Sequence, residues 1–248
     1  MIGTVVLAAG GATRFGSPKL LAEWWGRPLV EWALRSAPTD GPRIAVVGRD
    51  TAKLRPLFVH YGFAVVRNSR PSSGLASSLR TGLDRLPAEV DAALVLLGDA
   101  PDIPPSVIER VRTAYRRENR AVAASYDGVR GHPVVLPRAD WEQIPKTGER
   151  AGALIVADLV ECGDLAAGSA DVDTPDDLFA LAAARHRVPL VTVDELGDRL
   201  DDPAQFAVRA LDAPGELPIT ELRDRAVGKG RMIQVVARVG GEYAALVG

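Results

Sequence analysis

The first segment of the chain combines the pattern of a buried strand with a glycine-rich turn. Residues 4–8 are short, apolar and rich in β-branched side chains, which is typical of a strand buried on both faces of a parallel sheet. Gly10, Gly11 and Gly16 follow, and glycine permits sharp turns and lets backbone amides approach a ligand closely. The pattern therefore predicts a central parallel strand whose carboxyl end faces a ligand.

Short apolar runs then alternate with helical stretches. The predicted strands after the first are residues 43–48, 63–67, 91–97 and 121–126. The predicted helices cover residues 28–37, 50–61 and 104–117, with another beginning near residue 74. This alternation predicts an α/β fold built around a parallel sheet.

Composition excludes several classes of function. The formal net charge of −2 provides no extended basic surface for nucleic acid, so any affinity for phosphate must be local. No apolar stretch approaches the roughly 20 residues that span a bilayer, and the N-terminus lacks the build of a signal peptide. We therefore expect a cytoplasmic protein that binds neither membranes nor nucleic acid.

Cysteine and histidine usage restricts the metals that the chain can hold. The single cysteine, Cys162, excludes an internal disulfide and a multi-cysteine zinc site. The three histidines, His60, His132 and His186, show no metal-ligand spacing. Any bound metal is therefore expected to be a hard cation on carboxylates.

Two cations follow the first glycines. Arg14 offers a planar fork and Lys19 a point charge where a polyphosphate would lie. Pro18 precedes the lysine, so the segment is expected to remain a loop until about Pro28. The spacing fits neither a P-loop nor a dinucleotide fingerprint. The segment is interpreted as a phosphate-binding loop, the alternative being an ordinary tight turn.

Polar residues follow two further predicted strands. Asn68 opens a turn-rich segment that leads into the helix near Gly74, and its amides and hydroxyls are expected at the same sheet edge as the first loop. An ordinary capped helix is the alternative. Asp99 follows the strand 91–97, where a carboxylate is well placed to hold a cation over phosphates. Asp102 is interpreted instead as the N-cap of the helix 104–117.

A third acidic segment lies near residue 173. Thr174 is predicted to cap a helix that Pro175 begins and that runs to about Arg185. Asp171 and Asp173 precede this helix. Capping alone would explain one carboxylate at this position.

The first loop, Leu-Ala-Ala-Gly-Gly-x-x-Arg-Phe-Gly-x-x-Lys-Leu-Leu, resembles the signature of the MobA-like nucleotidyltransferases and is closest to the molybdenum cofactor cytidylyltransferase type. Phe15 stands where the family usually has Met. The resemblance extends over about residues 4–181 and implies a three-layer, Rossmann-like nucleotidyltransferase domain with a mostly parallel sheet, followed by a small C-terminal α/β module.

The resemblance also implies roles for individual residues. Arg14 and Lys19 would be catalytic, Asp99 and Asp173 would bind Mg²⁺, and His132 would lie on the acceptor side. The implied nucleotide-binding residues are Leu7, Ala8, Ala9, Gly10, Gly11, Asn68, Gly74 and Ser78. The segment 146–153 follows the family pattern only in part, which leaves the acceptor open.

The implied reaction transfers a nucleotide, with CMP from CTP favoured, to a phosphorylated pterin-type acceptor such as molybdenum cofactor, and releases pyrophosphate. The cytidylyl assignment rests on Leu-Ala-Ala-Gly in place of Leu-Ala-Gly-Gly at the first loop and on Gly-Leu-Ala-Ser-Ser-Leu at the second. Two alternatives remain. One is a guanylyl or sugar-phosphate nucleotidyltransferase, and the other is a non-catalytic, nucleotide-binding maturation factor for a molybdoenzyme client.

The C-terminal residues are predicted to form a separate small domain. Val188-Pro189 is interpreted as a boundary, which gives domains of residues 1–187 and 188–248. The second domain faintly resembles a degenerate rhodanese-like module, in which Ala237 occupies the place of the nucleophilic cysteine. Sulfur transfer is therefore not expected, and docking, dimerisation or shielding of the active site are the roles considered.

Overall fold

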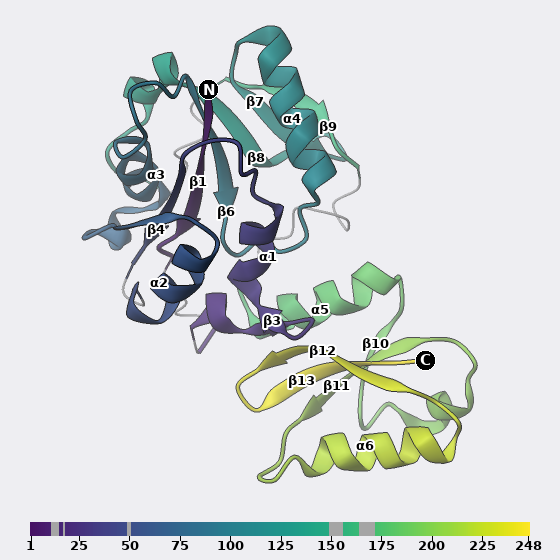
Figure 1. Ribbon diagram of the computed structural model, residues 1–248. Coiled ribbons are helices and arrows are strands. Elements are labelled where there is room, and N and C mark those ends of the chain that lie inside the picture. The colour runs from purple at the N-terminus through teal and green to yellow at the C-terminus, as the bar shows by residue number, and fades with distance from the viewer. Residues whose placement is uncertain (11–14, 17, 49–50, 149–155, 164–171) are drawn as a thin grey trace. The chain divides into compact units, whose positions relative to one another are not determined.

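The computed structural model (Figure 1) describes residues 1–10, 15–16, 18–48, 51–148, 156–163 and 172–248. The chain forms two compact units: unit 1 comprises Met1–Ala12 and Val30–Ser169, and unit 2 comprises Thr13–Leu29 and Ala170–Gly248. Residues 172–187 thus group with the C-terminal strands, whereas the boundary expected from the sequence follows residue 187. That domain boundary itself stays a prediction.

Unit 1 is built on a seven-stranded sheet. Its strands, in spatial order, are β5 (Ala64–Arg67), β4 (Arg43–Val47), β1 (Ile2–Ala8), β6 (Ala92–Leu97), β8 (Val129–Pro137), β7 (Val122–Tyr126) and β9 (Asp158–Glu161). Of these strands of the described chain, only β8 runs antiparallel to its neighbours. The predicted α/β fold with a mostly parallel sheet is confirmed.

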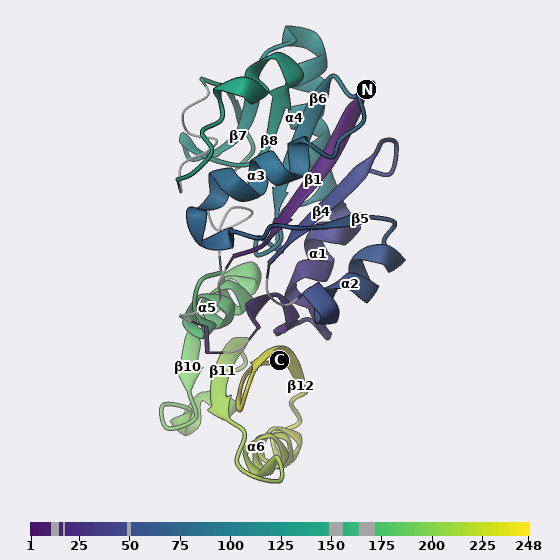
Figure 2. The same ribbon diagram turned by 90° about the vertical axis from the view of Figure 1, so that its left-hand side faces the viewer.

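Helices cover this sheet, and their bounds lie within a few residues of those predicted. They are α1 (Leu29–Ser36), α2 (Thr51–His60), α3 (Leu75–Leu83) and α4 (Pro105–Glu118), with short 3₁₀ turns η2 (Pro71–Ser73) and η3 (Arg138–Gln143). Right-handed crossovers put α1 and α2 on one face of the parallel strands and α3 on the other (Figure 2). Gly82 lets α3 approach the sheet, because a Cβ there would lie 2.5 Å from Val5 Cγ1.

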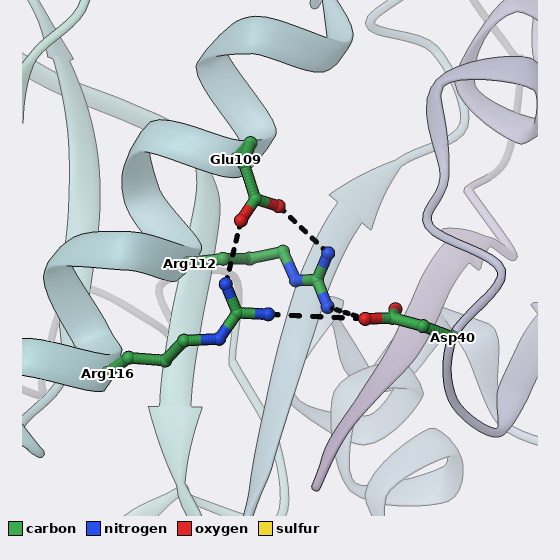
Figure 3. Close-up of polar contacts among 4 residues, drawn as sticks. All are labelled: Asp40, Glu109, Arg112 and Arg116. Carbon is green, nitrogen blue, oxygen red and sulfur yellow. Dashed lines mark hydrogen bonds and ion pairs between the residues drawn. The ribbon is translucent and has the colours of Figure 1, made fainter.

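A buried arginine ties α4 to the loop that precedes β4 (Figure 3). The Arg112 side chain, 7% exposed, donates hydrogen bonds to Asp40 at 2.5 Å and to Glu109 at 2.9 Å. Arg116 donates to the second oxygen of Glu109 at 2.7 Å. The hydrogen bond and charge of Arg112 hold the pKa of Asp40 below its ordinary value. Since Asp40 precedes β4, this network lies away from the carboxyl ends of the strands.

Unit 2 contains a six-stranded sheet. Its strands, in spatial order, are β10 (Leu190–Thr192), β11 (Phe206–Leu211), β13 (Glu242–Val247), β12 (Ile233–Val239), β2 (Glu23–Trp24) and β3 (Arg27–Pro28). The prediction that the first loop continues to about Pro28 is wrong for β2 and β3. The reason is tertiary: β12, from the far end of the chain, supplies the strand with which β2 pairs.

Two helices pack against this second sheet. Figure 1 shows α5 (Pro175–His186) and α6 (Leu217–Gly228) on opposite faces of it. The described residues of this unit also form the 3₁₀ turns η1 (Lys19–Leu21) and η5 (Gly197–Asp201). Trp24 is 0% exposed. Trp25 packs edge-on against Trp24, and the centroid of its ring lies 5.1 Å from that of His186, so both tryptophans take part in packing.

Of the two predicted helix N-caps, one is confirmed and the other is wrong. Thr174 caps α5, as predicted. Asp102 does not cap α4, whose N-cap is Pro104 and has no side-chain hydrogen bond. Pro104 and Pro105 follow the aspartate, and α4 begins at Pro105, beyond the position that Asp102 would cap. None of the helices in the described ranges is both long and apolar enough to cross a membrane.

Candidate functional site

The carboxyl edge of the unit 1 sheet is formed by closely packed backbone. The Gly98 amide donates to the Leu7 carbonyl at 2.9 Å, and a Cβ on Gly48 would lie 2.9 Å from the Ala9 carbonyl oxygen. The side chains of Leu7, Ala8 and Ala9 are buried, at 5–6% exposure. Any contact of these three residues with a ligand would therefore be made by their backbone.

The glycines after β1 differ from one another in conformation. Gly16 has φ of +70°, the left-handed conformation expected of it. Gly10 is exposed and does not have a positive φ, and a Cβ there would meet no described atom within 4 Å. Open space beside its backbone is thus what Gly10 provides. Gly11 and Arg14 lie outside the described residues.

Asn68, Gly74 and Ser78 form one hydrogen-bonded turn. The Asn68 side-chain amide donates to the hydroxyls of Ser77 and Ser78, at 3.0 Å each. Gly74 is the N-cap residue of α3 and has φ of +92°. Asn68 and Ser78 are both 5% exposed. The structure therefore brings these predicted residues together, and the side chains of Asn68 and Ser78 are hydrogen-bonded to each other in the turn that leads into α3.

Asp99 and His132 interact electrostatically in unit 1. Asp99 follows β6, and His132 lies on the antiparallel neighbour β8, where Val95 pairs with Val134. Burial lowers the pKa of His132, although the Asp99 carboxylate and the Val95 backbone favour its charged form. The His132 Nδ1 atom is buried and has no hydrogen-bond partner among the described residues. The pair thus combines a carboxylate with a neutral imidazole that has an unused polar atom.

Lys19 and Asp173 meet in unit 2. Lys19, on η1, is 9% exposed, and its Nζ lies 3.2 Å from Asp173 Oδ1. The Asp173 side chain is 47% exposed. A largely buried ammonium is thus held against a carboxylate that solvent can reach.

A capping box at the start of α5 positions Asp173. The Asp177 carboxylate accepts hydrogen bonds from the amides of Thr174 at 2.7 Å and Asp173 at 3.0 Å, and the Thr174 hydroxyl accepts from the Asp177 amide. Burial raises the pKa of Asp177, but these hydrogen bonds and the charge of Lys19 hold it below its ordinary value. The backbone of Asp173 is therefore fixed from the helix that follows it.

Asp99 and Asp173 each carry the carboxylate oxygens that a hard divalent cation prefers. Among the described residues, no group of three or more His, Cys, Asp or Glu side chains is arranged to hold a metal. Mg²⁺ does not require such a group, because it commonly binds one or two carboxylates together with substrate phosphates and water. Asp99 and Asp173 offer oxygen ligands of this kind, one in each unit.

Comparison with known proteins decides the family. The pattern of the MobA-like NTP transferase domain matches residues 4–162, well over half of the chain. The chain belongs to the MobA-like NTP transferase family. The match includes Lys19, Asp99 and His132, whereas Asp173 and the C-terminal strands lie beyond it.

Curated relatives of this MobA-like chain include cofactor nucleotidyltransferases. It is 23% identical over 194 residues to the molybdenum cofactor cytidylyltransferase of Escherichia coli (strain K12), covering 75% of this chain and 97% of that one. It is 28% identical over 134 residues to a molybdenum cofactor guanylyltransferase of Mannheimia succiniciproducens, covering 53% and 68% of the two chains. A bifunctional protein GlmU from Sorangium cellulosum is 34% identical over 129 residues, but these cover only 27% of that protein and 48% of this chain.

A solved structure agrees with the fold of this MobA-like chain. Rv0371c from Mycobacterium tuberculosis H37Rv is 25% identical and has a TM-score of 0.63, with 73% of this chain and 96% of that chain covered. Other nucleotidyltransferases of lower identity share the Rossmann-like fold. The Rossmann-like α/β fold predicted from the sequence is thereby confirmed.

Sequence analysis did not identify Arg209. This residue, on β11, pairs with Asp176 in the first turn of α5 and with Glu242 on β13. Its local sequence is a short apolar run with one charge, which resembles any half-buried strand. No signal in the sequence could have linked it to Asp173, since its partners come from two other segments of the chain.

Proposed function

We propose that this MobA-like protein is a Mg²⁺-dependent nucleotidyltransferase that moves CMP from CTP to a phosphorylated pterin-type acceptor such as molybdenum cofactor. The observation that carries the proposal is the contact of Lys19 with Asp173 in a chain of this family. A cation that neutralises phosphate charge and a carboxylate that can hold a metal ion are both needed beside transferring phosphates.

Lys19 would neutralise phosphate charge in the transition state. Its ammonium is mostly buried, and a charge acts more strongly where water is excluded. Arg14 is assigned the same task from the sequence. Asp99 and Asp173 are the proposed ligands of Mg²⁺, which when bound supplies further neutralisation of phosphate charge. Positioning and charge neutralisation carry most of phosphoryl-transfer catalysis, so no covalent nucleophile is required.

His132 would contact the acceptor. Because burial lowers the pKa of His132, the ring is neutral near pH 7 and can donate or accept a hydrogen bond through its unpartnered Nδ1. The electrostatic interaction of its ring with Asp99, one proposed metal ligand, supports this role. A neutral donor or acceptor there would orient an acceptor phosphate oxygen without adding charge.

The nucleotide assignment favours CTP. The cytidylyltransferase relative aligns over nearly its whole length, and the first loop has Leu-Ala-Ala-Gly. GTP is the second candidate, because the guanylyltransferase relative has the higher identity, 28%, over its shorter alignment. Both nucleotides would use the same loop and carboxylates.

The test is pyrophosphate release from each of the four ribonucleoside triphosphates with Mg²⁺, with and without molybdenum cofactor. Wild type is compared with Asp99→Asn and with Asp102→Asn, a matched control on the same loop. We expect acceptor-dependent release from CTP that Asp99→Asn abolishes and Asp102→Asn retains. Equal loss in both variants would contradict the role of Asp99.

The remaining outcomes separate the alternatives. Acceptor-dependent release from GTP would keep the reaction and change the nucleotide. Release that requires a sugar phosphate would replace the pterin acceptor. Nucleotide binding without release under any acceptor would contradict the enzymatic proposal and favour a maturation factor for a molybdoenzyme.

A further inference from the structure

Lys19 is attached to the C-terminal sheet through β2. The turn η1 that carries Lys19 leads into β2, where Trp24 pairs with Ala237 of β12. The Trp25 amide extends this ladder with a hydrogen bond of 2.7 Å to the Val236 carbonyl. Residues near the C-terminus therefore determine where the turn bearing Lys19 lies in unit 2.

Asp173 is attached to the same sheet through α5. Arg209, on β11, places Nη1 2.6 Å from Asp176 Oδ1. Its Nη2 lies 3.1 Å from each carboxylate oxygen of Glu242 on β13. The guanidinium also stacks over the Phe179 ring, with 5.1 Å from Cζ to the ring centroid. One planar side chain thus joins two strands to the first turns of α5.

The contacts of Arg209 with α5 lie close to Asp173 in the sequence. Asp176 is three residues after Asp173, and the capping box fixes the intervening backbone. A shift of the first turn of α5 would therefore move the Asp173 carboxylate relative to Lys19. Arg suits this position better than Lys because its planar fork binds two carboxylates and an aromatic face at once.

We infer that Arg209 is a positioning residue that holds Asp173 against Lys19. The inference rests on the proposed function in that it takes this ion pair as part of the transferase site. It goes beyond the family match, because Arg209 lies outside residues 4–162. The C-terminal sheet is then a structural part of the catalytic machinery.

The principal test compares Arg209→Met with Arg231→Met. Methionine keeps an unbranched apolar chain on Phe179 and removes both ion pairs. Arg231 is a matched control in the same unit, since it stacks over Phe206 and donates to the carbonyls of Leu200, Asp202, Ala204 and Val247. Its loss should destabilise unit 2 without releasing α5.

The first readout does not depend on catalysis. Lys19 in the substrate-free protein is acetylated with acetic anhydride and quantified by mass spectrometry, with Lys53, Lys146 and Lys229 as internal references. We expect Lys19 to react slowly in wild type and in Arg231→Met, because it is buried and ion-paired. Arg209→Met should raise the labelling rate of Lys19 several-fold and leave the reference lysines unchanged.

A second variant tests the same contact in case Arg209→Met does not fold. Asp176 has a side chain that is 71% exposed, so Asp176→Asn removes one ion pair of Arg209 without disturbing buried residues. It should raise Lys19 labelling in the same direction. The double variant should add little to Arg209→Met, because both substitutions act through one contact.

The second readout is kinetic. In CTP-dependent pyrophosphate release, Arg209→Met should lower kcat about tenfold or more with a smaller change in KM, because misplacement of catalytic groups affects chiefly the transition state. Arg209→Lys should restore part of kcat, whereas a purely structural role would lower only the fraction of active enzyme.

The outcomes separate this inference from the proposed function. Unchanged Lys19 labelling in folded Arg209→Met and Asp176→Asn would overturn it even if the enzyme is active. Equal labelling increases in Arg209→Met and Arg231→Met would also overturn it, as they would show general loosening of unit 2. If wild type transfers no nucleotide, the proposed function fails, and the labelling comparison still decides whether Arg209 positions the pair.

Discussion

The two units assemble their predicted site residues in different ways. In unit 1, Asn68 bonds to Ser78, ten positions away, across a turn that directly follows β5. In unit 2, Lys19 meets Asp173 across 154 positions. The first arrangement is built by one loop and its neighbouring helix, whereas the second exists only because β12 and α5 are in place.

The two groups of site residues are held in place by different parts of the fold. Asp99, Asn68 and the backbone after β1 are carried by strands of a buried parallel sheet, so the core of unit 1 positions them directly. Lys19 lies on a three-residue turn with little structure of its own. It depends on a sheet formed mainly by the last sixty or so residues, so its position is the more sensitive to changes far away in the sequence.

Truncation after residue 187 is the strongest test of this dependence. It removes β10, β11, β12 and β13, leaving Trp24 and Phe179, both 0% exposed, without the sheet on which β2 and α5 pack. We expect residues 1–187 to aggregate or to lose structure around Trp24, as measured by size-exclusion chromatography and tryptophan fluorescence.

A point variant separates this effect from loss of chain length. Ala237→Pro keeps every residue but disrupts β12 between β13 and β2, where proline is not tolerated. It should shift fluorescence in the same direction. A well-folded, monomeric fragment of residues 1–187 with buried tryptophans would support the domain boundary predicted from the sequence and contradict the dependence of β2 on β12.

Lys19→Ala should have the largest effect among substitutions that preserve the fold. Loss of one charge from the transition state typically lowers kcat about 100- to 1,000-fold. Lys229→Ala is the matched control, because Lys229 is ion-paired in the same unit but its side chain is 50% exposed. Turnover is measured as pyrophosphate release, and near-normal turnover of folded Lys19→Ala would contradict the catalytic role proposed for Lys19.

Thr174→Ala should have a moderate effect confined to the start of α5. It removes half of the capping box, which typically costs about 1 kcal/mol. Thr220→Ala on α6 is the control, since that hydroxyl donates to the carbonyl of Glu216, the N-cap residue of the same helix. Urea unfolding measures both variants. Equal free energies of unfolding for Thr174→Ala and Thr220→Ala would contradict a specific stabilising role of the capping box.

Asp40→Asn should have the smallest effect, and that effect should depend on pH. Arg112 lowers the pKa of Asp40 in the folded protein. The carboxylate therefore stabilises the fold at pH values above its pKa in the unfolded chain, which is about 3.8. This contribution is lost as pH falls through the lower, folded pKa. The free energy of unfolding in urea should change less between pH 6 and pH 3 in Asp40→Asn than in wild type. An identical change in both proteins would contradict a stabilising ion pair between Asp40 and Arg112.

Much of the fold could be predicted from local pattern. The strands β1, β4, β5, β6 and β7 and the helices between them lie within a few residues of their predicted bounds. Their buried runs and caps are signals contained in a few adjacent residues. The predicted N-cap Asp102 is the exception. Pro104 is the N-cap and Pro105 the first residue of α4, and the local motif does not indicate which residue before the helix is its cap.

The sequence by itself determined the parallel α/β sheet, the family signature of the first loop and the capped helix that follows Asp173. Tertiary structure alone decided that residues 23–28 are strands, that Lys19 lies against Asp173 and that Arg209 joins α5 to β13. The physical reason is sequence separation. A strand of two residues and an ion pair across 154 positions have no local pattern, because each is stabilised only by a partner that folding brings to it.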